Sequence, residues 1–154
     1  MRLVSTLTEP RVLDPEDVDR LTGSLAERCR SLPVLLLYLH GTHARGTQSV
    51  LSDLDLAVLL ERTSAREGRA RMAVVSALEE ACERDDVDLV ILNTAGPIIA
   101  DRVVRHGRLV YARSERERVA FEASAIKHSL DFRYFSRVYD DALFRRIREG
   151  RFLD

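Results

Sequence analysis

The chain has 154 residues, of which 45% are hydrophobic, 32% charged and 6% aromatic, and its formal net charge at pH 7 is −1. This composition is typical of a soluble globular protein and argues against a disordered chain or a membrane protein. The charge balance argues against a general nucleic-acid-binding protein, which usually carries a basic excess or a basic stripe. We therefore expect a single domain over residues 1–154, with no membrane span and no direct nucleic-acid binding.

Cys29 and Cys82 are the only cysteines, and neither lies in a close Cys-x-x-Cys or Cys/His cluster of the kind that zinc requires. The N-terminus shows no charged and then apolar leader, so we expect the protein to reside in the reducing environment of the cytoplasm.

The first half of the chain predicts a helix followed by two strands. Residues 14–17 read Asp-Pro-Glu-Asp, a favourable helix start, and apolar residues then recur at helical spacing, so we expect a helix over residues 15–31. Residues 34–40 are apolar nearly throughout, which is typical of a strand buried on both faces. Residues 53–60 predict its partner strand.

The second half predicts further helices and strands. We expect a helix from about residue 64 to residue 84, a strand over 87–92, and a helix that begins at Gly96-Pro97 and ends at His106-Gly107. The helix of residues 64–84 offers a candidate buried stripe of Met72, Val75, Leu78 and Cys82. Candidate core residues of the next helix are Ile98, Ile99, Val103 and Val104.

The remaining chain predicts a short strand over 108–111 and a long helical region over 114–150, with one possible break near Asp140. Ser114 and Glu117 form the Ser-x-x-Glu pattern of a capping box. The C-terminal segment DFRYFSRVYDDALF is aromatic and amphipathic; packing in the core is the favoured interpretation, and a partner-binding surface is the alternative. Together the elements predict an α/β domain with a small mixed sheet, helices packed on one side, and one edge open to a nucleotide.

A glycine turn and two aspartates carry the strongest chemical signal. Gly41 and Thr42 close the first apolar strand, and a glycine-led turn that runs into a short helix directs backbone N–H groups outward, which suits an oligophosphate. Ten residues later Asp53 and Asp55 stand at i and i+2, so they project from one face of the second strand. Carboxylates this close repel each other unless a divalent cation lies between them.

Asp88 supplies a third carboxylate. If the strand of residues 87–92 pairs with that of residues 53–60, Asp88 stands beside Asp53 and Asp55. Two carboxylates could then hold magnesium and bridge it to nucleotide phosphates, while the third completes a second metal position or accepts the proton of an attacking hydroxyl. Such an arrangement would perform phosphoryl-type transfer by positioning and charge neutralisation.

The stretch HGTHARGTQSVLSDLDLAVLL, followed by VDLVILN, resembles the minimal nucleotidyltransferases of the DNA polymerase beta superfamily, whose hallmark is Gly-Ser, about ten residues, and then Asp-x-Asp. Within that superfamily it is most similar to the MntA-like antitoxins that are paired with HEPN-domain toxins in type VII toxin–antitoxin systems. The resemblance covers residues 34–93. It implies that Asp53, Asp55 and Asp88 form a two-metal Mg²⁺ site.

The same resemblance implies that Gly41 and Thr42 form the phosphate loop and that Arg45 makes a further phosphate contact. Thr42 departs from the family, which usually has serine there: threonine keeps the hydroxyl, but its methyl group adds bulk where the triphosphate approaches. His43, at the variable position of the motif, would lie near a bound phosphate and add positive charge when protonated.

The implied function is Mg²⁺-dependent transfer of AMP from ATP to a hydroxyl, expected to be a tyrosine, of a cognate HEPN RNase toxin, with which the chain would form a hetero-oligomer. One alternative is a non-catalytic antitoxin that neutralises the toxin by complex formation. Another is nucleotide transfer to a small molecule such as an aminoglycoside, although the chain is short for that class.

Overall fold

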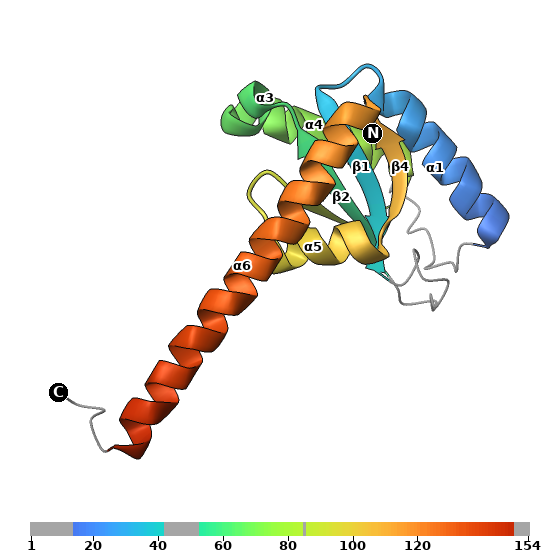
Figure 1. Ribbon diagram of the computed structural model, residues 1–154. Helices are drawn as coiled ribbons and strands as arrows, with labels where there is room; N and C mark the ends of the chain where they lie inside the picture. Colours follow the sequence, from blue (N-terminus) through green and yellow to red (C-terminus); the bar gives the residue numbers. More distant parts are fainter. Residues whose placement is uncertain (1–13, 42–52, 85, 150–154) are drawn as a thin grey trace, which may run out of the picture.

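The computed structural model describes residues 14–41, 53–84 and 86–149. Its elements, shown in Figure 1, are α1 (Pro15–Cys29), β1 (Val34–His40), β2 (Leu54–Leu60), α3 (Arg62–Arg66), α4 (Gly68–Cys82), β3 (Val87–Ile91), α5 (Pro97–His106), β4 (Arg108–Ala112) and α6 (Glu115–Arg148).

The strands form one mixed sheet in the order β3-β2-β1-β4. β1 pairs antiparallel with both β2 and β4, and β2 pairs parallel with β3. The parallel pair needs a crossover connection, which α3 and α4 provide. The predicted α/β class and mixed sheet are confirmed.

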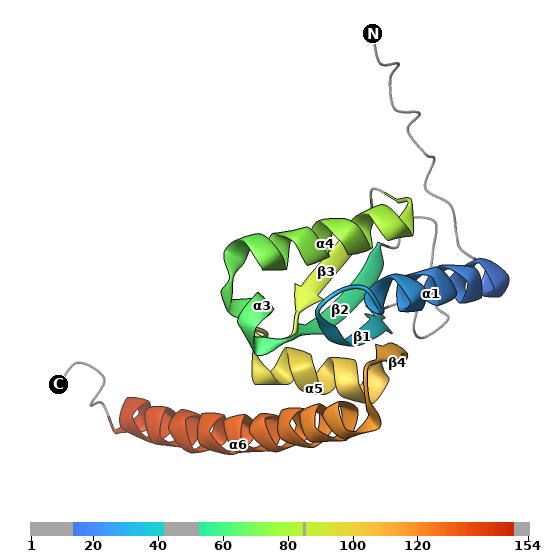
Figure 2. The same cartoon turned by 90° about the horizontal axis from the view of Figure 1, so that it is seen from above.

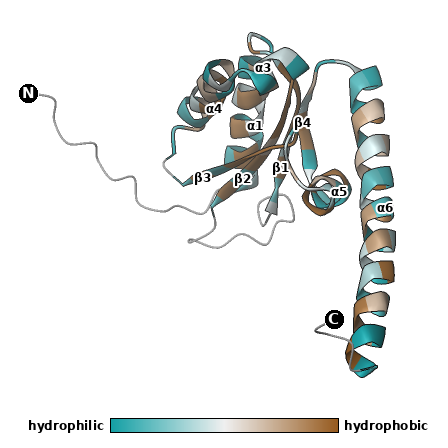
Figure 3. Cartoon of the chain, turned by 90° about the vertical axis from the view of Figure 1, so that its left-hand side faces the viewer, coloured by the Kyte–Doolittle hydropathy of each residue, from teal (hydrophilic) through white to brown (hydrophobic). Residues whose placement is uncertain are grey.

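Helices cover both faces of the sheet, so the prediction of helices on one side was wrong (Figures 2 and 3). Alternate residues of a strand point to opposite faces, and both faces of β1 are apolar. Leu37 and Leu39 pack in a core that includes residues of α1 and α4. Leu36 and Tyr38 pack in a second core with Val103 of α5. A strand that is apolar on both faces needs a helical layer on each.

The predicted start of α1 is confirmed, because the Asp14 carboxylate accepts a hydrogen bond of 2.8 Å from the backbone N–H of Asp17. The next predicted helix is divided in two at Glu67, whose ψ of 108° is extended rather than helical.

The buried stripe of α4 differs in part from the predicted one. Leu78 and Cys82 are buried as predicted, but Met72 is 58% exposed, and the remaining buried positions are Val74 and Ala77. At 100° per residue, Met72 points about 160° away from the buried Val74, so it lies on the opposite side of the helix.

In α5, Val103 is buried as predicted, but Ile99 is exposed and Ala100 and Asp101 take its place inside. Asp101 can be buried because it is paired: its carboxylate accepts hydrogen bonds from Arg105 at 2.7 Å and from Arg133 of α6 at 3.2 Å. This ion-pair cluster links α5 to α6.

The long helix α6 is continuous for 34 residues and does not break near Asp140. The predicted N-cap at Ser114 is confirmed, because the Glu117 N–H donates to the Ser114 hydroxyl at 3.2 Å. The Glu117 carboxylate accepts from that hydroxyl at 2.9 Å, whereas in a capping box it accepts from the backbone N–H of the N-cap residue. The favoured interpretation of its aromatic segment as core was wrong, since these aromatic side chains are exposed on a helix that extends past the body of the protein (Figure 1). Within the described ranges, no helix combines the length and apolar character that crossing a membrane requires.

Candidate active site at one end of the sheet

The end of β1 and the starts of β2 and β3 bring chemically active side chains together. Asp55 pairs in register with His40 across the antiparallel ladder and with Asp88 across the parallel ladder. Register partners point to the same face of a sheet, so these three side chains share one face. Asp53 lies two residues before Asp55, immediately ahead of β2, and its charge acts on Arg84 at the start of β3.

Gly41 closes β1 directly against Asp55. Its φ is +70°, a conformation that L residues with a side chain rarely adopt. A Cβ built on Gly41 would lie 1.9 Å from Oδ2 and 2.8 Å from Cγ of Asp55. Both the backbone angle and the space therefore require glycine here, and the close approach holds the turn against the carboxylate.

An arginine stands next to the acidic face at the start of β3. The backbone N–H of Leu54 donates to the carbonyl of Asp86 at 2.8 Å, which ties the starts of β2 and β3 together. Arg84 Nε donates to Asp86 Oδ1 at 2.6 Å, and a second bond joins the same two side chains. The pKa of Arg84 is raised, first by the hydrogen bond to Asp86 and further by the charges of Asp86 and Asp53. Asp86 thus has a structural role at the strand entry.

Four of the predicted site residues can be placed. Gly41, Asp53, Asp55 and Asp88 lie at one end of the sheet, with Asp55 partly buried and Asp53 and Asp88 exposed. The predicted phosphate contacts Thr42, His43 and Arg45 lie outside the described residues.

His40 is not among the site residues that the sequence predicted, but the structure places it opposite Asp55. Its Nε2 is buried without a hydrogen-bond partner among the described residues. The signal in the sequence was its position as the last residue of an otherwise apolar strand, directly before Gly41.

The side chains suit a Mg²⁺ ion whose coordination is completed by a substrate. Among the described residues, no group of three or more His, Cys, Asp or Glu side chains is placed to hold a metal by itself. Mg²⁺ is usually bound by one or two carboxylates, with water and substrate phosphates supplying the other ligands. The Asp55 and Asp88 pair, beside a turn that only glycine can form, fits this kind of open site.

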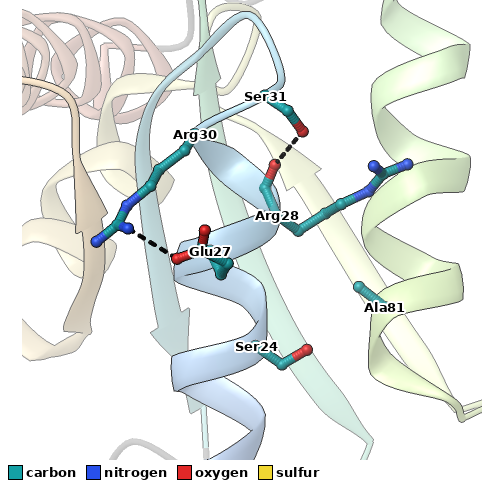
Figure 4. A pocket seen from close by; sticks show the side chains of 6 residues that line it. All are labelled: Ser24, Glu27, Arg28, Arg30, Ser31 and Ala81. Carbon is teal, nitrogen blue, oxygen red and sulfur yellow. Dashed lines mark hydrogen bonds and ion pairs between the residues drawn. The ribbon is translucent and has the colours of Figure 1, made fainter.

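A separate hollow between α1 and α4 lies on the opposite face of the sheet (Figure 4). It is lined by Ser24, Glu27, Arg28, Arg30, Ser31 and Ala81. Arg30 donates to Glu27 at 2.8 Å, and the Ser31 hydroxyl donates to the carbonyl of Arg28 at 3.0 Å. These polar groups are satisfied within the chain, and they lie on the other side of the sheet from the acidic face.

Comparison with known proteins agrees with this geometry. A protein adenylyltransferase MntA from Shewanella oneidensis is 37% identical over 78 residues, which are 49% of this chain and 52% of the relative. The chain thus aligns with about half the length of the curated relative it matches. A solved toxin–antitoxin structure with AMP-PNP matches with a TM-score of 0.64 at 26% identity, covering 80% of this chain and 98% of that one.

A variant of the MntA-HpeT toxin–antitoxin complex matches with a TM-score of 0.60 at 26% identity, covering 86% of this chain and 99% of that one. The family model described as polymerase beta nucleotidyltransferase matches residues 24–116, which include β1, β2, β3 and every described residue of the acidic face. The chain belongs to the polymerase beta nucleotidyltransferase family.

Proposed function

We propose that this protein is the antitoxin of a toxin–antitoxin pair and that it transfers AMP from ATP to a hydroxyl of a HEPN-domain toxin, with tyrosine as the expected acceptor and Mg²⁺ as the cofactor. The observation that carries the proposal is the register of the sheet, which sets Asp55 opposite Asp88 beside the Gly41 turn. The relatives support it: one is a protein adenylyltransferase, and another is a toxin–antitoxin structure with AMP-PNP.

Each residue of the acidic face has a proposed role. Asp53 and Asp55 hold the cation from one strand, and the cation, when bound, neutralises charge on the phosphates and the leaving pyrophosphate. Asp88, across the parallel ladder, serves as a further ligand or accepts the proton of the attacking hydroxyl. Gly41 lets the backbone pass close to Asp55, so that backbone N–H groups of the turn can face the phosphates. The reaction forms a phosphoester to the acceptor oxygen and breaks the bond between the α- and β-phosphates of ATP.

The test is transfer of labelled AMP to the purified toxin in the presence of Mg²⁺. Asp55→Asn removes a negative charge with little change of volume, and we expect the transfer rate to fall by at least 100-fold. Asp19→Asn is the matched control, because Asp19 is an exposed carboxylate of α1 whose ion pair with Arg108 contributes little. Absence of transfer by the unchanged protein, while it demonstrably binds ATP, would contradict the proposal.

A second candidate function is neutralisation by complex formation alone. It is favoured by one observation, the exposed aromatic segment of α6, which offers a binding surface without any chemistry. The double variant Asp53→Asn with Asp55→Asn separates the two functions in cells at matched expression. If this variant still protects cells from the toxin, catalysis is dispensable; if protection is lost while the complex persists, catalysis is required.

A further inference from the structure

The C-terminal half of α6 carries an unusually large apolar surface, which we call the distal segment (residues 132–148). Its exposed large apolar side chains are Phe132, Tyr134, Phe135, Val138, Tyr139, Phe144 and Ile147. In contrast, the proximal part of the helix packs on α5 and the sheet, and Ser129 is its last buried residue. Figure 1 shows the distal segment extending beyond the other elements of the protein.

The distal segment extends past the same end of the sheet that carries the acidic face. The backbone N–H of Arg113 donates to the carbonyl of Leu35 at 2.9 Å, and further along both elements the Tyr38 hydroxyl donates to Glu122 at 3.0 Å. α6 therefore runs in the same direction as β1, toward His40. At 1.5 Å per residue, α6 passes the level of the end of β1 at about residue 130. Figures 1 and 3 agree with this direction.

The apolar side chains are distributed around the whole circumference of the helix. At 100° per residue, Tyr134, Phe135 and Tyr139 lie on one side, and Phe144 and Ile147 lie on the other. A helix that packs on a flat surface carries a single apolar stripe, whereas the large apolar side chains of the distal segment point to more than one side and alternate with arginines and aspartates. A partner that covers these apolar side chains must therefore contact the helix from more than one side, as the walls of a groove do.

We propose that the distal segment inserts into an apolar groove between helices of the toxin and thereby holds the acceptor hydroxyl next to the acidic face. This inference rests on the proposed function, in which a HEPN-domain toxin is the partner. The exposed parts of the seven large apolar side chains amount to roughly 800 Å², given that an aromatic side chain buries about 150–250 Å². This equals what one partner contributes to a standard stable interface, about 800 Å².

A second copy of this chain fits the distal segment less well than a grooved partner. Two helices that pair along their length each cover only one stripe of the other, so most of the circumference would stay exposed. The charges point the same way, because residues 132–148 contain five arginines and two aspartates, a net charge of +3 in a chain whose net charge is −1. Two such segments repel each other, while a groove with an acidic rim attracts one.

The test measures binding and transfer separately with the purified HEPN-domain toxin that the proposed function names as acceptor. Phe135→Glu with Tyr139→Glu replaces two side chains that are each 69% exposed, so the fold should be unaffected. Burying the two new charges in an apolar groove is costly, so binding to the toxin should weaken. We expect the Kd for the toxin to rise by at least 100-fold and the KM for the toxin as acceptor to rise in parallel. The affinity for ATP should change by less than twofold, because neither residue lies near the acidic face.

Two controls make the result specific. Met72→Glu changes a side chain of similar exposure, 58%, on α4 of the opposite layer, and it should leave toxin binding unchanged. Phe135→Leu with Tyr139→Phe keeps the surface apolar and should retain binding. Unchanged helix content and melting temperature would show that each variant is folded.

The outcomes separate this proposal from the proposed function. If no AMP is transferred but toxin binding is lost in the glutamate variant, docking holds and the proposed chemistry fails. If the glutamate variant binds the toxin as tightly as the unchanged protein, docking by the distal segment is wrong. It is equally wrong if sedimentation shows that the chain alone forms a dimer which the glutamates disperse, or if the segment binds single-stranded RNA instead of the toxin.

Discussion

Replacing Gly41 by alanine tests the geometry of the acidic face most directly. Alanine in the left-handed region costs about 1–2 kcal/mol. The added Cβ would also lie 1.9 Å from Oδ2 of Asp55, far inside any real contact, so the turn or the carboxylate must move by more than about 1 Å. A displacement of about 1 Å at a reacting group can reduce a rate by roughly 100-fold. We therefore expect Gly41→Ala to lose at least this much transfer activity.

The stability effect of the same change is expected to be smaller. At 2–4 °C per kcal/mol for a protein of this size, the backbone cost lowers the melting temperature by about 2–8 °C. Gly23→Ala is the matched control, because Gly23 lies within α1, has no positive φ, and has no atom within 4 Å of the added Cβ. It should stabilise the protein by about 0.5–1 kcal/mol, since alanine favours helix. Full transfer activity in Gly41→Ala, at an unchanged melting temperature, would refute the close approach of Gly41 to Asp55.

Two further substitutions and one labelling experiment test the packing of the fold. Burial alone would raise the pKa of Asp101, but its two arginine partners lower that pKa below the ordinary value. The ionised Asp101 therefore stabilises the fold above about pH 3.9, and this stabilisation is lost as the pH falls below that value. Asp101→Ala should lower the free energy of unfolding in urea at pH 7 by about 1–3 kcal/mol and reduce the loss of stability in acid. Tyr38→Phe removes the 3.0 Å hydrogen bond to Glu122 and should cost about 1 kcal/mol without changing ATP affinity. Burial raises the pKa of the Cys29 and Cys82 thiols to about 12. A thiol reagent at pH 8 should therefore label neither cysteine until the protein is unfolded. Rapid labelling of the native protein would contradict the burial of these thiols.

Local patterns in the sequence were sufficient to predict most elements, whereas the pairing on which the site depends entered the sequence analysis only as a condition. The apolar runs at residues 34–40 and 53–60 are strands, and the strand that follows pairs with the second of them so that Asp55 stands opposite Asp88. The roles of these carboxylates as metal ligands stay predictions. Strand alternation fixes the face of each residue once the neighbouring strand is known, but it does not show which strands are neighbours.

The errors arose where tertiary packing overrides local periodicity. The spacing of Met72 and Leu78 is compatible with one apolar stripe, but α4 turns the side that carries Val74 toward the core, and local spacing does not show which side that is. Ile99 is exposed while Asp101 is buried, since arginines from two helices neutralise the aspartate, a long-range arrangement that no local pattern reveals. The aromatic residues of α6 are of the type that usually builds a core, but the sheet ends before the helix reaches them, so they are exposed.

The topology explains why chemistry and recognition are expected at the same end of the molecule. In the antiparallel pair β1–β2, the end of one strand meets the start of the next, so the Gly41 turn lies against Asp55. In the parallel pair β2–β3, both strands start at that end, so Asp88 joins them. α6 then follows β4 on the adjacent side and runs in the direction of β1, which carries its distal segment past this end. A protein bound to the distal segment would therefore lie next to the acidic face, so that the segment would hold the acceptor while the acidic face modifies it.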